Sequence, residues 1–293
     1  MGTLYVIGTP IGNLEDITLR ALRLLGEVSL IAAEDTRTTR GLLAHFGLAT
    51  PLVSFHQHNQ AQRLPYLLER LREGDIALVS EAGMPGVSDP GQALVEAVAR
   101  EGFPVAAVPG PSAVTAALAI SGLPADAFLF LGFLPRERKE RQGLLAQCAS
   151  LPFTLVWFEA PHRLLASLRD ALEALGERPC AVCRELTKLH EEVFRGTLSQ
   201  ALAHFTHPRG EFTIVVQGAT PSQGRVWTEE RVVQALRDAL VSGLRPTQAV
   251  AQVARRAGWP RARVYAMWAK WGQERGSPQK SPKPRPGRGV TSG

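Results

Sequence analysis

Short apolar runs alternate with amphipathic segments through most of the chain, a pattern typical of β-α units and a largely parallel sheet. In the N-terminal part the pattern predicts strands at residues 4–8, 30–33, 76–80 and 105–108, with helices at 18–25, 40–46, 62–72, 91–101 and 112–121. A second α/β segment follows, with helices at 139–149, 162–175 and 198–205 and strands at 154–158, 179–185, 192–195 and 212–217. The expected fold class is therefore α/β, in two domains.

Breaks in this pattern indicate the domain organisation. Pro135 and a dense charge cluster interrupt the apolar rhythm near residues 133–141, which indicates a boundary there. After residue 228 the periodicity is helical, and the segments 246–257 and 261–271 resemble a helix-turn-helix. The expected organisation is an α/β domain at 1–120, a second at 121–220, a helical appendage at 226–275 and a disordered basic tail at 276–293.

The positive charge is concentrated at the C-terminal end. Residues 255–293 hold ten of the 33 Lys and Arg residues but one of the 27 acids. The remaining 23 basic and 26 acidic residues give residues 1–254 a net charge near −3, against +9 for the end. This asymmetry favours a polyanionic partner for the C-terminal part, and a solubilising tail is the plainer alternative for residues 276–293.

The remaining composition excludes several classes. An apolar fraction of 45% is ordinary for a globular protein, and no apolar run approaches the roughly 20 residues of a membrane span. The chain begins directly on a strand-like run, so we expect a cytoplasmic protein with no membrane partner. The pair Cys180 and Cys183 has C-x-x-C spacing but no second ligand pair, and it lies in a predicted strand. Two buried strand cysteines are the favoured interpretation.

Three predicted strand-to-helix connections, at residues 8–16, 80–91 and 109–115, are rich in glycine and proline. Each follows a strand, so all three are expected at the carboxyl edge of the sheet, where open α/β folds bind ligands. Glycine lets backbone approach a ligand closely, and proline keeps a loop stiff. Pro10 replaces the second glycine of a dinucleotide fingerprint, and the loop has no G-K-[ST]. One such loop suits a structural turn, but three predict a small nucleoside-type ligand.

These loops resemble those of the tetrapyrrole-methylase superfamily. The resemblance rests on G-x-P-x-G-N-L-x-D-I-T at residues 8–18, E-A-G-M-P-G-V-S-D-P-G at 81–91 and P-G-P-S-A at 109–113. Further blocks are A-E-D-T-R at 33–37, F-E-A-P-H-R at 158–163, R-E-L-T-K at 184–188, R-G at 195–196 and G-E at 210–211. They are similar to the branch that methylates the ribose 2′-hydroxyl of a cytidine in the decoding region of small-subunit ribosomal RNA. The resemblance covers about residues 3–218.

The resemblance implies two domains with a cleft between them for S-adenosylmethionine, and a homodimer. It carries the cofactor contacts onto residues of the three loops. These are Pro10, Gly12, Gly83, Val87, Asp89, Ser112, Ala113 and Thr115. The last three begin a predicted helix, whose free amides and hydroxyls suit a carboxylate or a ribose.

Methyl transfer to a ribose hydroxyl gains from alignment and from a nearby general base. The candidate catalytic residues are Glu34, Asp35 and Glu159. Glu34 and Asp35 end a predicted strand, where a site at the sheet edge would present them, and capping of the next helix is an equally open alternative. Asp89 is favoured as a loop-shaping cofactor contact rather than as a base. The histidines show no metal-ligand pattern, so no metal site is assigned.

Basic residues beside the motif blocks are candidates for RNA contacts. They are Arg37, Arg40, His162, Arg163, Arg184 and Lys188, with Arg261 and Arg263 on the second helix of the C-terminal pair. Singly, each is equally compatible with a solvated charge. A helix-cap role for His162 and a surface ion-pair role for Lys188 also stay open. The implied partner is small-subunit ribosomal RNA within an assembled subunit.

Two other functions remain as alternatives. A methyltransferase of the same fold acting on a tetrapyrrole or another small molecule would have no use for a basic helical appendage. A non-enzymatic nucleic-acid-binding protein would have no use for stiff Gly/Pro loops.

Overall fold

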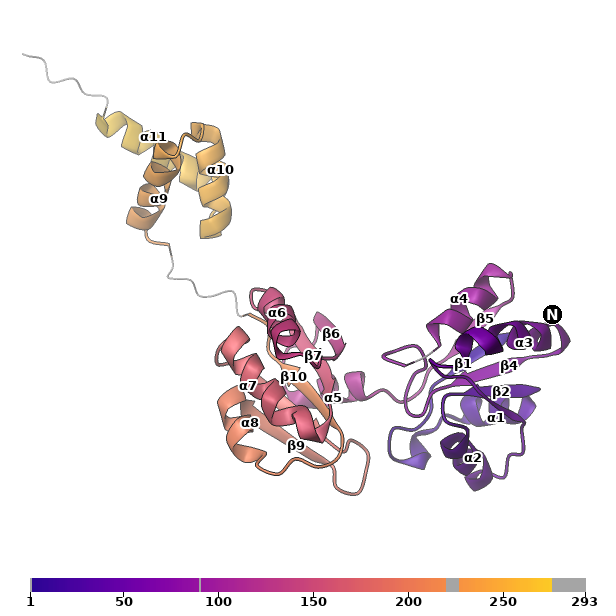
Figure 1. Cartoon of the computed structure of the whole chain (residues 1–293). Helices are drawn as coiled ribbons and strands as arrows, with labels where there is room; N and C mark the ends of the chain where they lie inside the picture. The colour runs from indigo at the N-terminus through magenta and orange to yellow at the C-terminus, as the bar shows by residue number, and fades with distance from the viewer. Residues whose placement is uncertain (1, 90, 220–226, 276–293) are drawn as a thin grey trace, which may run out of the picture. The chain divides into compact units, whose positions relative to one another are not determined.

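The computed structural model describes residues 2–89, 91–219 and 227–275. The chain divides into two compact units, Met1–Thr220 and Pro221–Gly293 (Figure 1). The expected disordered tail at 276–293 lies outside the described residues. None of the described helices is both long enough and apolar enough to cross a membrane.

The first sheet is fully parallel, as the sequence predicts, with the strand order β3-β2-β4-β1-β5 (Figure 1). Its strands are β1 (Leu4–Ile7), β2 (Leu30–Ala33), β3 (Leu52–Ser54), β4 (Ile76–Val79) and β5 (Val105–Val108). The connecting helices are α1 (Leu19–Glu27), α2 (Thr36–His45), α3 (Gln60–Glu73) and α4 (Gln92–Arg100), with a 3-10 helix η1 (Leu14–Asp16). Parallel strands bring every β-to-α loop to one edge of the sheet.

Alternation along the strands gives this sheet two buried faces. Ile31 and Val79 pack with α1 and α2, whereas Leu30 and Leu78 pack with α3 and α4. Helices on both faces bury β2 and β4 completely. The loops at the carboxyl edge therefore stand on a rigid base.

The second sheet is mixed, with the order β6-β7-β10-β8-β9, and only β6 and β7 pair in parallel. Its strands are β6 (Phe128–Phe133), β7 (Thr154–Glu159), β8 (Pro179–Arg184), β9 (Glu192–Thr197) and β10 (Phe212–Val216). Its helices are α5 (Ala113–Ser121), α6 (Arg138–Cys148), α7 (Leu164–Leu175) and α8 (Leu198–His204), with a 3-10 helix η2 (Pro161–Arg163).

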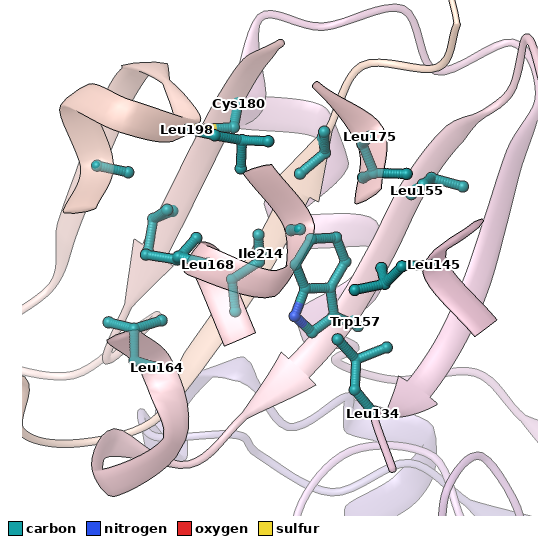
Figure 2. Packing of buried hydrophobic residues seen from close by; sticks show 14 of the residues in the cluster. Leu134, Leu145, Leu155, Trp157, Leu164, Leu168, Leu175, Cys180, Leu198 and Ile214 are labelled. Carbon is teal, nitrogen blue, oxygen red and sulfur yellow. The ribbon is translucent and has the colours of Figure 1, made fainter. Parts of the chain in front are cut away.

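The core on one face of this sheet surrounds the fully buried Trp157 (Figure 2). Leu134, Leu145 and Leu168 pack in the same cluster, and the indole Nε1 donates a hydrogen bond to Ser167 Oγ at 3.1 Å. The opposite face packs against α5 through Val114. The sequence placed this helix in the N-terminal domain at 1–120. In the structure, α5 instead shares its core with the second sheet.

The C-terminal unit is a bundle of three helices around Val232, Leu236, Val250 and Val253. They are α9 (Glu229–Val241), α10 (Pro246–Ala257) and α11 (Arg261–Arg275). Gly258 ends α10 with a φ of 67°, a left-handed conformation that glycine adopts without strain. The predicted pair of helices joined by a tight turn is confirmed.

Three sequence expectations were wrong in detail. The domain boundary predicted near residues 133–141 lies within the part of the chain that forms the second sheet, because β6 precedes the charge cluster and pairs with β7. Strands β3 and β6 were missed, since neither contains a fully buried residue and their hydrophobic patterns are therefore weak. Helix α2 begins at Thr36 rather than residue 40, because the Asp35 carboxylate caps it by accepting a 2.8 Å hydrogen bond from Arg37 N.

Candidate functional site

The first two Gly/Pro loops are joined by backbone hydrogen bonds. Thr9 and Gly83 exchange N–H···O bonds of 2.9 and 3.0 Å, which form an isolated antiparallel bridge beyond β1 and β4. Gly83 has a φ of 81°, which disfavours a side chain at that position. The two loops therefore hold one geometry without help from a ligand.

The first and third loops touch through bare backbone. A Cβ built on Gly8 would lie 2.8 Å from Gly110 Cα, and one built on Gly110 would lie 2.7 Å from Gly8 O. Neither position accepts a side chain, since neighbouring atoms do not approach a Cβ so closely. Together with the Thr9–Gly83 bridge, this contact gathers all three loops at the edge where the sequence predicted them.

The third loop leads into the N-terminus of α5. Ser112 is the N-cap residue of α5, yet its hydroxyl makes no capping hydrogen bond. Thr115 Oγ1 donates to Ser112 O at 3.2 Å, and Ala113 is the first helical residue. The first amides of a helix lack internal acceptors and favour an anion.

The second loop reaches the second sheet. A Cβ on Gly132 of β6 would lie 3.1 Å from Ser88 Oγ. Ser88 has a φ of 63°, uncommon for a residue other than glycine. Val87 beside it is exposed, and Asp89 is half-buried. A strained loop with an exposed apolar side chain is suited to contact a ligand.

The first loop also meets the second sheet, at Gly12. A Cβ there would lie 2.5 Å from Lys188 Cγ and 2.7 Å from Thr187 Oγ1, and Pro10 is half-buried two residues earlier. Thr187 has a φ of 66°, and its Oγ1 is buried with no hydrogen-bond partner among the described residues. Gly12 therefore allows close packing between two motif blocks.

Lys188 is held by carboxylates. Its Nζ lies 3.0 Å from Glu185 Oε1 and 2.9 Å from Glu211 Oε2. Burial lowers the pKa of Lys188, but the hydrogen bonds to Glu211 and Glu185 outweigh it and raise the pKa overall. A Cβ on Gly210 would lie 2.6 Å from the Glu185 side chain. The blocks at 184–188 and 210–211 thus contact each other, and two of their carboxylates already bind the Lys188 ammonium group.

Acidic side chains converge at the carboxyl edge of the first sheet. Glu34 Oε2 accepts a 3.3 Å hydrogen bond from Glu81 N. The pKa of Asp89 rises from its ordinary value to about 6, chiefly through burial and then through the charges of Glu34 and Glu81, against an opposing hydrogen bond with Ser80. Glu34 thus lies beside the second Gly/Pro loop, which itself holds Glu81 and Asp89, and a carboxyl group with a pKa shifted toward neutrality is typical of functional sites.

Asp35, the next residue, has a different environment. Its carboxylate binds Arg37 at 2.8 and 3.2 Å and accepts from the Arg37 amide, which lowers the pKa of Asp35 to about 2. A carboxylate with so low a pKa is a weak proton acceptor. The capping role left open by the sequence is confirmed, and Arg37 is engaged by its own helix cap.

The Glu159 side chain lies on the face of the second sheet opposite to the face that packs against α5. Its side chain is fully buried, and its Oε1 lies 3.3 Å from Arg163 Nε. Arg163 in turn donates to Leu134 O at 2.6 Å and Pro135 O at 3.1 Å. Glu159 and Arg163 therefore brace the loop that follows β6, which argues against both a general base and a phosphate contact at these two positions.

The other basic candidates differ in whether their side chains are bound to neighbouring residues. Arg40 and His162 are exposed. Arg184 donates to Arg209 O at 2.7 Å and Glu192 Oε2 at 3.2 Å. In the C-terminal unit, Arg263 lies 3.9 Å over the Trp259 ring, and Arg261 donates to Thr247 O at 3.4 Å, with both side chains exposed.

Sequence reasoning missed the two hollows that flank His162. One includes Phe133 and Arg136, and the other His207 and Arg209. None of these four residues belongs to a motif block, so only the three-dimensional arrangement groups them. Among the described residues, no cluster of three His, Cys, Asp or Glu side chains could hold a metal ion.

Comparison with known proteins identifies relatives over most of the chain. Residues 3–202 match the sequence model of the family described as Tetrapyrrole (Corrin/Porphyrin) Methylases. The protein named ribosomal RNA small subunit methyltransferase I from Synechocystis sp. is 48% identical over 271 residues, which cover 91% of this chain and 97% of the relative. The protein of that name from Thermotoga maritima is 52% identical over 221 residues, 74% of this chain and 99% of the relative.

A solved structure shares the fold. Uroporphyrin-III C-methyl transferase from Thermus thermophilus, complexed with S-adenyl homocysteine, superposes with a TM-score of 0.52 at 24% identity, covering 73% of this chain and 97% of that one. At this identity the likeness concerns the fold alone.

Proposed function

Because the chain belongs to the tetrapyrrole methylase family, we propose that it transfers a methyl group from S-adenosylmethionine to the ribose 2′-hydroxyl of a cytidine in the decoding region of small-subunit ribosomal RNA. The observation that carries the proposal is the 48% identity, over 91% of the chain, to a protein named for methylation of that RNA. The basic C-terminal end is in keeping with an RNA substrate.

The residues at the loop edge fit S-adenosylmethionine. Backbone contact at Gly8 and Gly110 keeps side chains out of the space beside the sheet edge, and Gly83 adds a stretch of bare backbone. The amides that open α5, with the uncommitted Ser112 hydroxyl, suit the methionine carboxylate. Pro10, Gly12, Val87, Asp89, Ala113 and Thr115 complete the proposed contacts. When bound, the cofactor supplies an electrophilic methyl group on a sulfonium.

For the proton of the ribose hydroxyl, we propose Glu34 as the acceptor. Asp35 is committed to Arg37, and Glu159 is buried with Arg163. Glu34 stands at the carboxyl end of β2, beside the second Gly/Pro loop, and its charge helps to hold a proton on Asp89. Asp89 then shapes the loop and contacts the cofactor, as the sequence suggested.

RNA docking is proposed for exposed basic groups on both units. Arg40 and His162 serve the first unit. Arg261 and Arg263 serve the second, where their contacts with Thr247 O at 3.4 Å and Glu229 Oε1 at 3.5 Å are long and both side chains are exposed. Arg37, Arg163, Arg184 and Lys188 contribute by shaping the surface, since each is bound to a neighbouring acid or carbonyl. On the family resemblance we further propose a homodimer that acts in the cytoplasm on an assembled small subunit.

The test is transfer of label from S-adenosylmethionine to small subunits that lack the modification, followed by mapping of the labelled nucleotide. We expect one labelled ribose in the decoding region. Label that stays at background, or that enters a base, would refute the proposal.

The role of Glu34 is tested in the same assay with Glu34→Gln. We expect kcat to fall by about 10²- to 10⁴-fold, the usual contribution of a general base, while cofactor affinity is kept. Asp35→Asn is the matched control, because it removes the neighbouring carboxylate. A Glu34→Gln enzyme with wild-type kcat would exclude this role.

A further inference from the structure

The loop after β6 borders a hollow of about 870 Å³, here called the Phe133 hollow, whose lining includes Phe133, Arg136, Ala160, His162 and Ala166. Its size is that of a small-molecule site. A second hollow of about 410 Å³, the His207 hollow, lies on the other side of His162, and its lining includes His207 and Arg209. Among the described residues that line the two hollows, none is acidic.

An aromatic ring stands at the rim of the first hollow. Phe133 is 56% exposed although it ends a strand, and its ring centroid lies 5.5 Å from that of Phe158. Phe158 packs edge-on against Phe130 at 5.0 Å. The ring is thus supported from one side and open on the other, as in the aromatic platforms on which unpaired bases stack.

The backbone beside this ring is rigidly held. Arg141 NH1 donates to Pro135 O at 3.1 Å and Arg136 O at 3.0 Å, and its charge is balanced by the buried Asp170. Arg163 binds the Leu134 and Pro135 carbonyls in the same way. Two arginines of the lining are therefore structural supports, and a loop fixed in advance loses little entropy on binding.

Other basic side chains of the lining are available to a ligand. Arg136 and His162 are exposed, and neither makes a side-chain hydrogen bond or ion pair within the described ranges. Arg209 is also exposed, although its carbonyl accepts from Arg184. Charges of this kind bind phosphates along a strand without reading its sequence.

The strand that ends at Phe133 also contacts the second Gly/Pro loop. Gly132, the residue before Phe133, approaches Ser88 of the second Gly/Pro loop, where a Cβ would lie 3.1 Å from the hydroxyl. A nucleotide at Phe133 would therefore be near the loop edge that holds Glu34 and Asp89.

We propose that Phe133 stacks a base of single-stranded RNA next to or at the acceptor nucleotide, and that the adjacent phosphates follow Arg136, His162 and Arg209 through the two hollows. This inference rests on the proposed function, since it names a substrate subsite of the same enzyme. The RNA bound at Phe133 is unpaired, because a base within a duplex has no free face to stack on a side chain.

The experiment compares Phe133→Ala and Phe133→Trp in methylation of unmodified small subunits. Base stacking on an aromatic side chain is worth about 1–3 kcal/mol, so Phe133→Ala should raise KM for the subunit roughly 5- to 150-fold. Phe133→Trp should restore it, while the affinity for S-adenosylmethionine is unchanged in both. Phe128→Ala is the matched control, because Phe128 is 44% exposed on the same strand but does not line the hollow.

Charge is tested separately with Arg136→Ala, against Lys139→Ala as a control that removes one exposed charge nearby. Arg136→Ala should raise KM for the subunit, whereas Lys139→Ala should not. Wild-type KM in Phe133→Ala, or equal effects of Phe133→Ala and Phe128→Ala, would overturn the subsite while leaving the methyltransferase intact. Loss of cofactor binding in Phe133→Ala would also overturn it, whereas an inactive wild type would refute the proposed function itself.

Discussion

At the scale of single residues, carboxylates close to one another in the sequence differ because their neighbours differ. Asp35 is bound to Arg37 and ionises at about pH 2, whereas Asp89 is desolvated beside Glu34 and holds its proton to about pH 6. Hydrogen bonding lowers the pKa of Asp35, whereas burial and nearby negative charges raise the pKa of Asp89. Only the second group titrates near the pH at which a cell works.

Asp89 predicts a pH-dependent effect on stability. Its folded pKa of about 6 lies above its ordinary value of 3.8, so ionisation destabilises the folded cofactor-free protein as pH rises through this range. Asp89→Asn removes that cost. Thermal unfolding should therefore show a larger gain in Tm for Asp89→Asn at pH 7.5 than at pH 4.

The exposed Asp126 provides the control, since Asp126→Asn also removes one negative charge. Its change in Tm should be small and similar at both pH values. A gain for Asp89→Asn that is equal at pH 4 and pH 7.5 would contradict the assignment.

The sequence predicted the location of the candidate site but only part of the roles of its residues. The motif blocks bring Glu34, Asp89 and Ser112 to one region, because loops after parallel strands must meet at one sheet edge. The sequence could not decide between capping and catalysis at Asp35, and it did not predict the role of Glu159, since each depends on a side-chain partner and on which strand face is buried. Phe133 was missed because an apolar residue at a strand end gives no sign of exposure until the strand is placed.

At the scale of elements, the three Gly/Pro loops act as one unit through their backbone contacts. The bridge at Thr9 and Gly83 joins two of them, and the contact of Gly8 with Gly110 joins the third. Long strongly patterned helices and buried strands were predicted to within a few residues. The missed strands β3 and β6 contain no fully buried residue, so their hydrophobic patterns are weak.

Gly110→Ala should separate the first and third loops. Its Cβ would meet Gly8 backbone at 2.7 Å, and overpacking of this kind costs about 1–3 kcal/mol. Because this contact positions two of the proposed cofactor loops, the dissociation constant for S-adenosylmethionine should rise by up to roughly 5- to 150-fold, measured by calorimetry.

Gly41→Ala is the matched control, because a Cβ at this helical position has nothing within 4 Å. It should leave cofactor affinity unchanged and should slightly stabilise α2. Equal cofactor affinities for the two variants would show that the loop contact does not control the site.

At the scale of the whole molecule, the chain joins a two-sheet unit to a basic three-helix unit. The Thermotoga maritima relative aligns over 221 residues that make up 99% of it, close to the length of the first unit. A protein of that size therefore contains the fold common to these relatives. The C-terminal unit is expected to add affinity for the substrate rather than chemistry.

Removal of residues 221–293 tests this division. The shortened protein should bind S-adenosylmethionine as the full chain does, while KM for the small subunit rises by about tenfold or more and depends less steeply on salt. Wild-type KM and salt dependence would show that the C-terminal unit does not dock RNA. Loss of cofactor binding would show that the two units share the active site.

The chain's three cysteines have a practical consequence. Cys148, Cys180 and Cys183 are all buried and unpaired, and burial raises the pKa of Cys180 to about 12 and of Cys183 to about 11. Thiols of this kind are almost never ionised at neutral pH and are inaccessible to reagents. A single cysteine introduced on the surface would therefore be the one site that a maleimide dye or spin label modifies. Pairs of such labels, one on each unit, would report how the two units move during a catalytic cycle in the otherwise native protein.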